Sequence, residues 1–231
     1  MVCWPHLAGR NLMTLRDLID VFRSLSMDTK SPYFVSDQLA ISFANEAQIE
    51  ACRRSDAIID SSSSFCQVSI LSGRPAVKLH PSIMELRRAR MQSGAYMLEP
   101  VTTTELDALS VQWESETGVP SHYVTDYSSG HIFLYPSPAT ADTLMLTVRR
   151  LPVSSMIDDA DVPEVREETH MALVHWMLYR AFSIPDSDFY SPTRAGMELA
   201  EFEREFGRKS SSRNELWSRV SHPSLDVSPI A

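Results

Sequence analysis

The spacing of apolar residues near the start of the chain predicts an amphipathic helix. These residues recur at intervals of three and four, which places them on one helical face: Leu15, Leu18, Ile19, Phe22 and Leu25. Thr14 precedes the run and Asp17 follows three positions later, in the arrangement of a capping box. The sequence therefore predicts a helix that begins just after Thr14.

A second helix is predicted in the stretch SDQLAISFANEAQIEACRRSD, residues 36–56. Its apolar positions recur every four residues: Leu39, Phe43, Ala47 and Ala51. Ser36 stands at the expected N-cap, and two arginines occupy the last turn, where the negative end of the helix dipole favours cations.

The middle of the chain changes to alternating apolar and polar positions, which predicts strands. Four consecutive serines at 61–64 indicate a linker, and residues 65–80 resemble a hairpin with Gly73 in its turn. A strand follows at 83–91, and Thr104 is the expected cap of a short helix. Three further segments read as a β-meander: 121–126, 131–135 and 143–150.

Helical spacing then returns. Residues 163–183 predict a helix with Pro163 in its first turn, and residues 192–206 predict another, capped by Ser191 and ended by Gly207. The predicted fold class is therefore α+β: terminal helix pairs form a helical bundle, and an antiparallel β-rich subdomain is inserted between them. The expected parts are an N-terminal arm, a first helical half, the β-rich subdomain, a second helical half and a C-terminal docking tail: 1–13, 14–60, 65–152, 153–207 and 208–231.

Composition fits a globular protein, with 43% hydrophobic and 22% charged residues. No apolar run approaches the ~20 residues of a membrane-spanning helix, and the N-terminus lacks a signal-peptide pattern. Three scattered cysteines indicate free thiols in a reducing compartment: Cys3, Cys52 and Cys66.

Charge is unevenly distributed along the chain. The formal net charge is −9, but the tail from Arg208 to Ala231 has four basic and two acidic residues and carries +2. The preceding part of the chain therefore carries −11. An acidic body disfavours tight binding to nucleic acid, because such binding needs several cations facing phosphates.

Candidate catalytic and metal-binding groups are weak. His170 and His175 are five residues apart, whereas metal ligands on one helical face need a spacing of three or four. Asp158, Asp159 and Asp161 lack the glycine and the distal glutamate of an EF-hand loop. The sequence also lacks a nucleophile elbow and a phosphate-binding glycine loop, so we expect no catalytic residue, metal or cofactor.

Two features indicate interaction surfaces. Arg87, Arg88 and Arg90 form the densest basic patch, and strand alternation puts Arg88 and Arg90 on one face. A solvated or interface face fits this patch better than a nucleic-acid contact does, because it is one short patch on an acidic protein. Trp4 and Trp217 lie in polar terminal arms, where large aromatic side chains usually find a partner surface.

Two longer motifs carry a resemblance to a known family. They are SDQLAISFANEAQIEACRR and PEVREETHMALVHWMLYRAFSIPDSD, and with the predicted meander the similarity covers about residues 14–208. The chain resembles the adaptor proteins, or head-to-tail connector proteins, of tailed bacteriophages. These motifs are framework patterns and carry no catalytic signature, so the resemblance implies no enzyme activity.

The resemblance implies a virion structural protein. Members form a homo-oligomeric ring, typically of twelve copies, which joins the portal protein to the tail or nozzle protein and lets DNA pass through its lumen. The implied location is the virion neck, after assembly in the host cytoplasm and without membrane contact.

Carried onto this sequence, the resemblance implies two sets of contact residues. The set expected to dock on the portal or tail is Trp4, Arg208, Lys209, Arg213, Trp217 and Arg219. The set expected between subunits pairs the basic patch with the acidic run: Arg87, Arg88, Arg90, Asp158, Asp159 and Asp161. The alternatives are a small metal-dependent hydrolase that uses His170 and His175, and a nucleic-acid-binding module built from the 83–91 strand and the tail.

Overall fold

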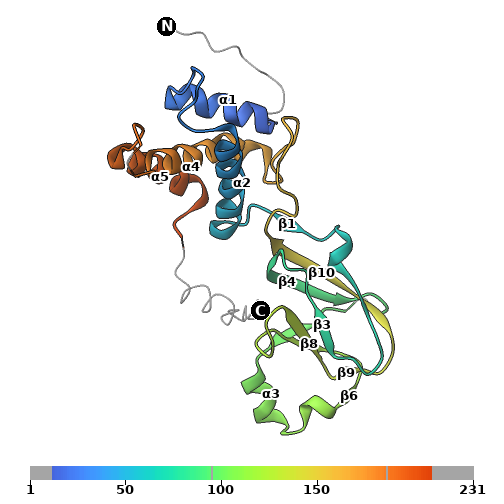
Figure 1. The fold of residues 1–231 in the computed structure, drawn as a ribbon. Coiled ribbons are helices and arrows are strands. Elements are labelled where there is room, and N and C mark those ends of the chain that lie inside the picture. Colours follow the sequence, from blue (N-terminus) through green and yellow to red (C-terminus); the bar gives the residue numbers. More distant parts are fainter. Residues whose placement is uncertain (1–11, 95, 186, 210–231) are drawn as a thin grey trace, which may run out of the picture. The chain divides into compact units, whose positions relative to one another are not determined.

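The computed structural model describes residues 12–94, 96–185 and 187–209, and it divides into two compact units (Figure 1). A helical unit contains the described residues up to Ile59 and those from Arg150 to Lys209. A β-rich unit contains residues Asp60–Arg149. The chain therefore has a mixed α+β fold, as the sequence predicts.

The helical unit is organised around one central helix. Helix α4 (His170–Phe182) packs against α1 (Leu15–Ser26), α2 (Asp37–Arg54) and α5 (Pro192–Phe206). The largest fully buried side chains of the helical unit come from α1, α4 and α5: Leu15, Leu18, Phe22, Leu173, Met177, Phe182 and Phe202. Helix α2 contributes alanines and Phe43, which allow close approach to α4.

Helix α1 begins where the sequence predicts. The hydroxyl of Thr14 accepts the backbone N–H of Asp17, and the Asp17 carboxylate accepts the backbone N–H of Thr14, which completes the capping box. One residue of the predicted apolar face, Leu25, is 43% exposed. The helix ends at Met27, whose left-handed backbone turns the chain.

The predicted start of the third long helix is wrong. Residues Pro163–Arg166 are not helical, and α4 begins at His170 after a 3₁₀ turn over Glu167–Thr169. The Glu164 carboxylate accepts the backbone N–H groups of Val153 and Ser154, which holds this segment in a loop.

The β-rich unit contains two four-stranded sheets. The first has the order β1–β10–β2, with β4 also paired to β10; its bounds are Ile59–Asp60, Asp142–Arg150, Gln67–Ile70 and Ile83–Met91. The second has the order β3–β8–β7–β5, with bounds Ala76–Lys78, His131–Tyr135, His122–Val124 and Glu99–Val101. A small third sheet pairs β6 (Thr117–Gly118) with β9 (Ser137–Pro138).

The predicted hairpin and three-stranded meander are both wrong, because consecutive strands enter different sheets. Strand β2 pairs with β10, whereas β3 pairs with β8. The turn between β2 and β3 has Gly73 at φ +70°, and its N–H donates to the carbonyl of Pro138. Likewise β7 and β8 pair with each other, but β10 joins the first sheet.

The sheets are also not wholly antiparallel. Strand β5 runs parallel to β7, and β6 runs parallel to β9. The chain between β5 and β7 includes helix α3 (Thr103–Leu109), and a crossover of this kind is what brings two strands into parallel register.

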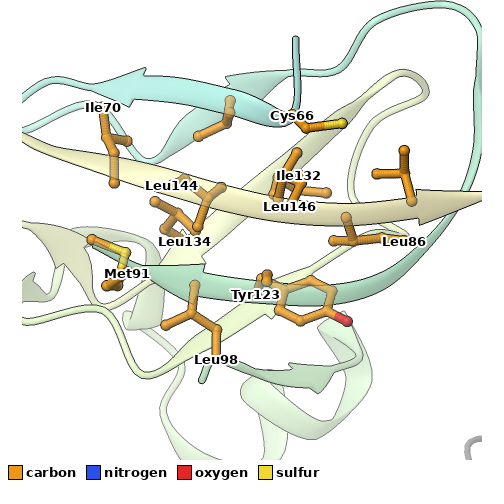
Figure 2. Close-up of a cluster of buried hydrophobic side chains, with 13 residues drawn as sticks. Cys66, Ile70, Leu86, Met91, Leu98, Tyr123, Ile132, Leu134, Leu144 and Leu146 are labelled. Carbon is orange, nitrogen blue, oxygen red and sulfur yellow. The ribbon is translucent and has the colours of Figure 1, made fainter. Parts of the chain in front are cut away.

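One apolar cluster joins the two large sheets. Figure 2 shows these buried side chains, which come from strands of both sheets and from the residues just before β2 and β5: Cys66, Ile70, Leu86, Met91, Leu98, Tyr123, Ile132, Leu134, Leu144 and Leu146. Burial of this apolar area against water is the main force that holds the sheets together.

The four serines at 61–64 are more ordered than a linker. The Asp60 carboxylate accepts the backbone N–H groups of Ser62 and Ser63 and both of their hydroxyls. A 3₁₀ turn then starts at Ser64. Local hydrogen bonds of this kind fix a turn at the start of the β-rich unit.

Candidate functional site

Strand β4 presents two arginines to one shallow hollow. Arg88 and Arg90 line a space of about 270 Å³ together with four residues from β10 and the turn after β1: Ser61, Met145, Leu146 and Thr147. Within the described part of the chain neither guanidinium group has an acidic partner. The hollow therefore carries two positive charges that the described residues do not neutralise.

Arg87, the third member of the predicted basic patch, has a different environment. Its Nε lies 3.3 Å from Oε1 of Glu85, and the other carboxylate oxygen of Glu85 lies 3.3 Å from Nη1 of Arg149. This arginine belongs to a charge cluster within the β-rich unit, so its positive charge is less available to a partner than those of Arg88 and Arg90.

The predicted acidic run supports the start of helix α1. The carbonyl of Asp161 accepts the N–H of Leu15 at 2.7 Å, and the carbonyl of Asp159 accepts the N–H of Arg16 at 3.1 Å. These donors belong to the first helical turn, whose N–H groups have no partner inside the helix. The acidic loop therefore ties α1 to the segment that leads to α4.

The three carboxylates of this run differ. The Asp161 carboxylate accepts the backbone N–H groups of Ile157 and Asp158, and these hydrogen bonds lower its pKa. The Asp159 carboxylate lies 3.9 Å from the guanidinium of Arg16, and Asp158 is exposed. Only Asp158 and Asp159 thus present charge outward, and their role between subunits remains a prediction.

The two histidines have structural partners. The Met13 N–H donates to Nδ1 of buried His170 at 3.2 Å, and Nε2 of His170 lies 3.0 Å from the carbonyl of Val165. His175 on α4 lies 2.7 Å from the Glu198 carboxylate on α5, which links these two helices. Within the described residues no group of three potential ligands could hold a metal ion.

The expected docking residues lie mostly outside the described residues. Four of the six lie outside them: Trp4, Arg213, Trp217 and Arg219. Arg208 and Lys209 follow the end of α5 and are exposed, with Nε of Arg208 at 3.9 Å from the Glu203 carboxylate. Gly207 precedes them at φ +84° and ends the helix.

No described helix is long and apolar enough to span a bilayer.

A buried charge network that sequence reasoning missed fixes the α1–α2 connection. Arg23 is 6% exposed and Asp28 is 2% exposed, and their side chains are joined at 2.9 Å. Arg23 also donates to the carbonyl of Val35 and to the Asp37 carboxylate. An arginine on the otherwise polar side of a predicted helix gives no sequence signal that it will be buried.

A second missed feature lies between α2, α4 and α5. Arg54 ends α2, and its guanidinium lies over the rings of Trp176 and Phe202 at 5.1 and 5.3 Å. It is also 3.5 Å from Glu50 and 3.2 Å from Glu203. Cation–π contacts and ion pairs together hold α5 against α2 and α4.

The third missed feature is the α3 tip, which we define as residues 102–119 of the β-rich unit. The sequence places the cap of its helix at Thr104, but Thr102 is the N-cap and forms a capping box with Glu105. Helix α3 ends at Leu109, and a 3₁₀ turn over Trp113–Ser115 follows. The buried ring of Trp113 packs edge-on against two tyrosines.

The α3 tip exposes apolar side chains between acidic ones. Leu109 is 76% exposed and Val111 is 93% exposed. The neighbouring carboxylates accept hydrogen bonds only from neutral donors: Asp107 from the Trp113 indole, and Glu114 from the Tyr127 hydroxyl. The chain from Met91 to Val148 contains seven acidic residues and no lysine or arginine, so no ion pair with Lys or Arg from this segment can neutralise the tip.

Comparison with known proteins places the chain in one family. The model of the SU10 adaptor protein family matches residues 13–223, so the chain belongs to this family of phage head-tail adaptors. No curated protein matches the sequence.

Proposed function

We propose that this protein is the head-to-tail adaptor of a tailed phage and forms a homo-oligomeric ring in the virion neck. The observation that carries the proposal is the family match over residues 13–223. In this role the ring joins the portal protein to the tail or nozzle protein, and DNA passes through its lumen. We expect twelve copies, with assembly in the host cytoplasm.

The charge distribution supports a passage that does not retain DNA. The net charge is −9, and the tail after Gly207 contributes +2, so the rest of the chain is strongly acidic. An acidic wall repels the phosphate backbone and lowers the affinity of the ring for the duplex. DNA then moves through the lumen without sequence-specific binding.

The distribution of structure supports a division of labour between the two units. We propose that the helix pairs form a bundle that serves as the body of the ring. Its rigidity comes from the buried Arg23–Asp28 pair and from Arg54 between α2, α4 and α5. A ring closes when each copy contacts its neighbours through two different surfaces, and rigid subunits make that closure reproducible.

The tail is the proposed portal contact. Arg208 and Lys209 are exposed directly after α5, and the residues that follow include Arg213, Trp217 and Arg219. A tryptophan anchor surrounded by arginines has the composition of an interface hot spot. Trp4, in the N-terminal arm, is a second proposed anchor. The basic charge of the tail predicts an acidic docking surface on the portal.

The test is the native mass of the purified protein alone and after mixing with the portal of the same phage. We expect the full chain to join the portal as a ring. Deletion of residues 208–231, or Trp217→Ala with Arg213→Ala, should abolish this association without unfolding α1 to α5. As a control, Met197→Ala changes an exposed side chain of α5 and should leave the association with the portal intact. A full chain that stays monomeric and indifferent to portal at every concentration would refute the proposal.

A further inference from the structure

We propose that the α3 tip of one copy docks onto the Arg88–Arg90 hollow of a neighbouring copy. This inference rests on the proposed ring, and it names the surfaces through which the β-rich units of adjacent subunits meet. The two surfaces belong to the same unit of the chain but lie apart: Figure 1 shows α3 near β6 and β9, away from β4. A contact between two different patches of the same unit is head-to-tail, which is the kind of contact that builds a ring.

Charge complementarity is the first argument. The hollow presents Arg88 and Arg90, which have no acidic partner among the described residues. The tip presents carboxylates that have only neutral hydrogen-bond donors, and the chain from Met91 to Val148 offers no lysine or arginine to pair with them. Each surface lacks the charge that the other supplies, so docking neutralises both.

The ionisation of two other tip carboxylates supports this charge complementarity. Glu105 accepts the backbone N–H and hydroxyl of Thr102, and these bonds lower its pKa. The pKa of Glu116 is lowered by the Tyr135 hydroxyl and then by Ser110. Both carboxylates therefore ionise more readily than an ordinary glutamate, and their local hydrogen bonds hold the charges in fixed positions.

The apolar side chains supply the second argument. Leu109 and Val111 are 76% and 93% exposed, at the end of a helix and in the turn after it. Met145 and Thr147 line the hollow together with the two arginines. The aliphatic stems of Arg88 and Arg90 add apolar surface that Leu109 and Val111 can cover. Interfaces combine a small apolar centre with a charged rim, and these two surfaces provide both.

The acidic run near α1 is the competing partner for the hollow, and the described contacts disfavour it. The Asp161 carboxylate is occupied by the N–H groups of Ile157 and Asp158, and Asp159 already lies near Arg16. Duplex DNA is a second competitor, because two arginines can also bind phosphates. Exposed Leu109 and Val111 have no counterpart on a DNA backbone, so a protein partner explains more of the structure.

The experiment uses two charge-reversed full-length chains. One is Asp107→Lys with Glu114→Lys and Glu116→Lys, which changes the formal charge of the tip from −4 to +2, so that tip and hollow are both positive. The other is Arg88→Glu with Arg90→Glu, whose tip and hollow are both negative. Neither should self-associate, and each should need at least about tenfold more protein than the wild type for half-assembly. An equimolar mixture should assemble, because positive tips then meet negative hollows and negative tips meet positive hollows throughout an alternating ring.

Folding and alternative partners need controls. Asp107→Asn with Glu114→Gln keeps acceptors for Trp113 and Tyr127, so it should fold and weaken assembly less than the reversal does. Leu109→Ser with Val111→Ser removes only the exposed apolar contact and should also weaken assembly. Asp158→Lys with Asp159→Lys reverses the competing acidic run and should assemble as the wild type does. Native mass spectrometry reports the size of each assembly, and far-ultraviolet circular dichroism reports folding.

The outcomes separate the two proposals. If the wild type assembles but the folded reversed variants also assemble alone, the contact is wrong and the adaptor ring stands. If Asp158→Lys with Asp159→Lys blocks assembly and Arg88→Glu with Arg90→Glu restores it in the mixture, the acidic run is the partner and the tip is not. If the reversed hollow loses affinity for a 20-base-pair duplex while assembly is unchanged, the hollow binds DNA. A wild type that never assembles, with or without portal, overturns both proposals.

Discussion

The guanidinium of Arg23 and the carboxylate of Asp28 form a buried ion pair at 2.9 Å, at the point where helix α1 turns toward α2. The same carboxylate accepts the backbone N–H groups of Phe34 and Val35. A single aspartate thus joins the end of α1, the connection and the approach to α2.

Replacement of Asp28 by Asn should destabilise the helical unit strongly. It leaves the buried Arg23 charge with the exposed Asp37 as its one acidic partner among the described residues, and breaking a buried pair in this way costs about 3–5 kcal/mol. Chemical denaturation followed by circular dichroism measures the change. The matched control is Asp20→Asn, which breaks an exposed pair with Arg16 on the same helix. Equal effects of both changes would show that the Arg23–Asp28 pair has no special role.

Truncation of Phe202 should detach α5. The Phe202 ring is fully buried and lies 5.0 Å from the ring of Trp176 and 4.7 Å from that of Phe206. Phe202→Ala should lower the free energy of unfolding by about 3–5 kcal/mol, through lost burial and the cavity left behind. Tryptophan fluorescence during denaturation reports the change. Met197→Ala on the exposed face of the same helix should have little effect, and a comparable loss there would contradict this packing.

The cap of helix α3 can be tested with two neighbouring threonines. Thr102→Ala should cost about 0.5–2 kcal/mol in the β-rich unit, because Thr102 is the N-cap of the helix. Thr104→Ala removes the residue that the sequence places at the cap, but Thr104 is exposed inside the helix, so stability should barely change. The reverse order of effects would mean that the helix begins two residues later.

The same capping box predicts a dependence on pH. The pKa of Glu105 is lowered in the folded state, so its contribution to stability is present above its ordinary value of about 4.5 and is lost as the pH falls through the folded pKa. Glu105→Gln keeps the capping geometry but removes the charge. The stability of this variant should therefore fall less than that of the wild type between pH 5 and pH 3. Parallel acid profiles for the two proteins would contradict the linkage.

Asn45 should anchor the loop that precedes α4. Its side-chain carbonyl accepts the N–H of Met156, and its amide donates to the carbonyls of Met156 and Ile41. Asn45→Ala leaves the Met156 backbone without these partners, which should cost about 1–3 kcal/mol. Hydrogen exchange should become faster around Met156. Gln38→Ala on the exposed side of α2 serves as the control and should change neither quantity.

The sequence alone determined the positions of the long helices, apart from the start of α4. Thr14, Ser36 and Gly207 mark helix ends through local backbone chemistry, and each has that role in the structure. Capping and periodicity depend on residues three or four apart, so they can be read without knowledge of the fold. The family resemblance that the sequence motifs indicate is confirmed by the family match over residues 13–223.

Tertiary structure decided the strand partners and the exposed surfaces. Strands β2 and β3 look like a hairpin in sequence, yet they enter different sheets because each finds its hydrogen-bond partner far along the chain. Burial of Arg23 and Arg54, and exposure of Leu109 and Val111, likewise depend on which elements pack above them. Long-range pairing and burial are properties of the assembled chain, whereas a periodic pattern records only which face of an element is apolar.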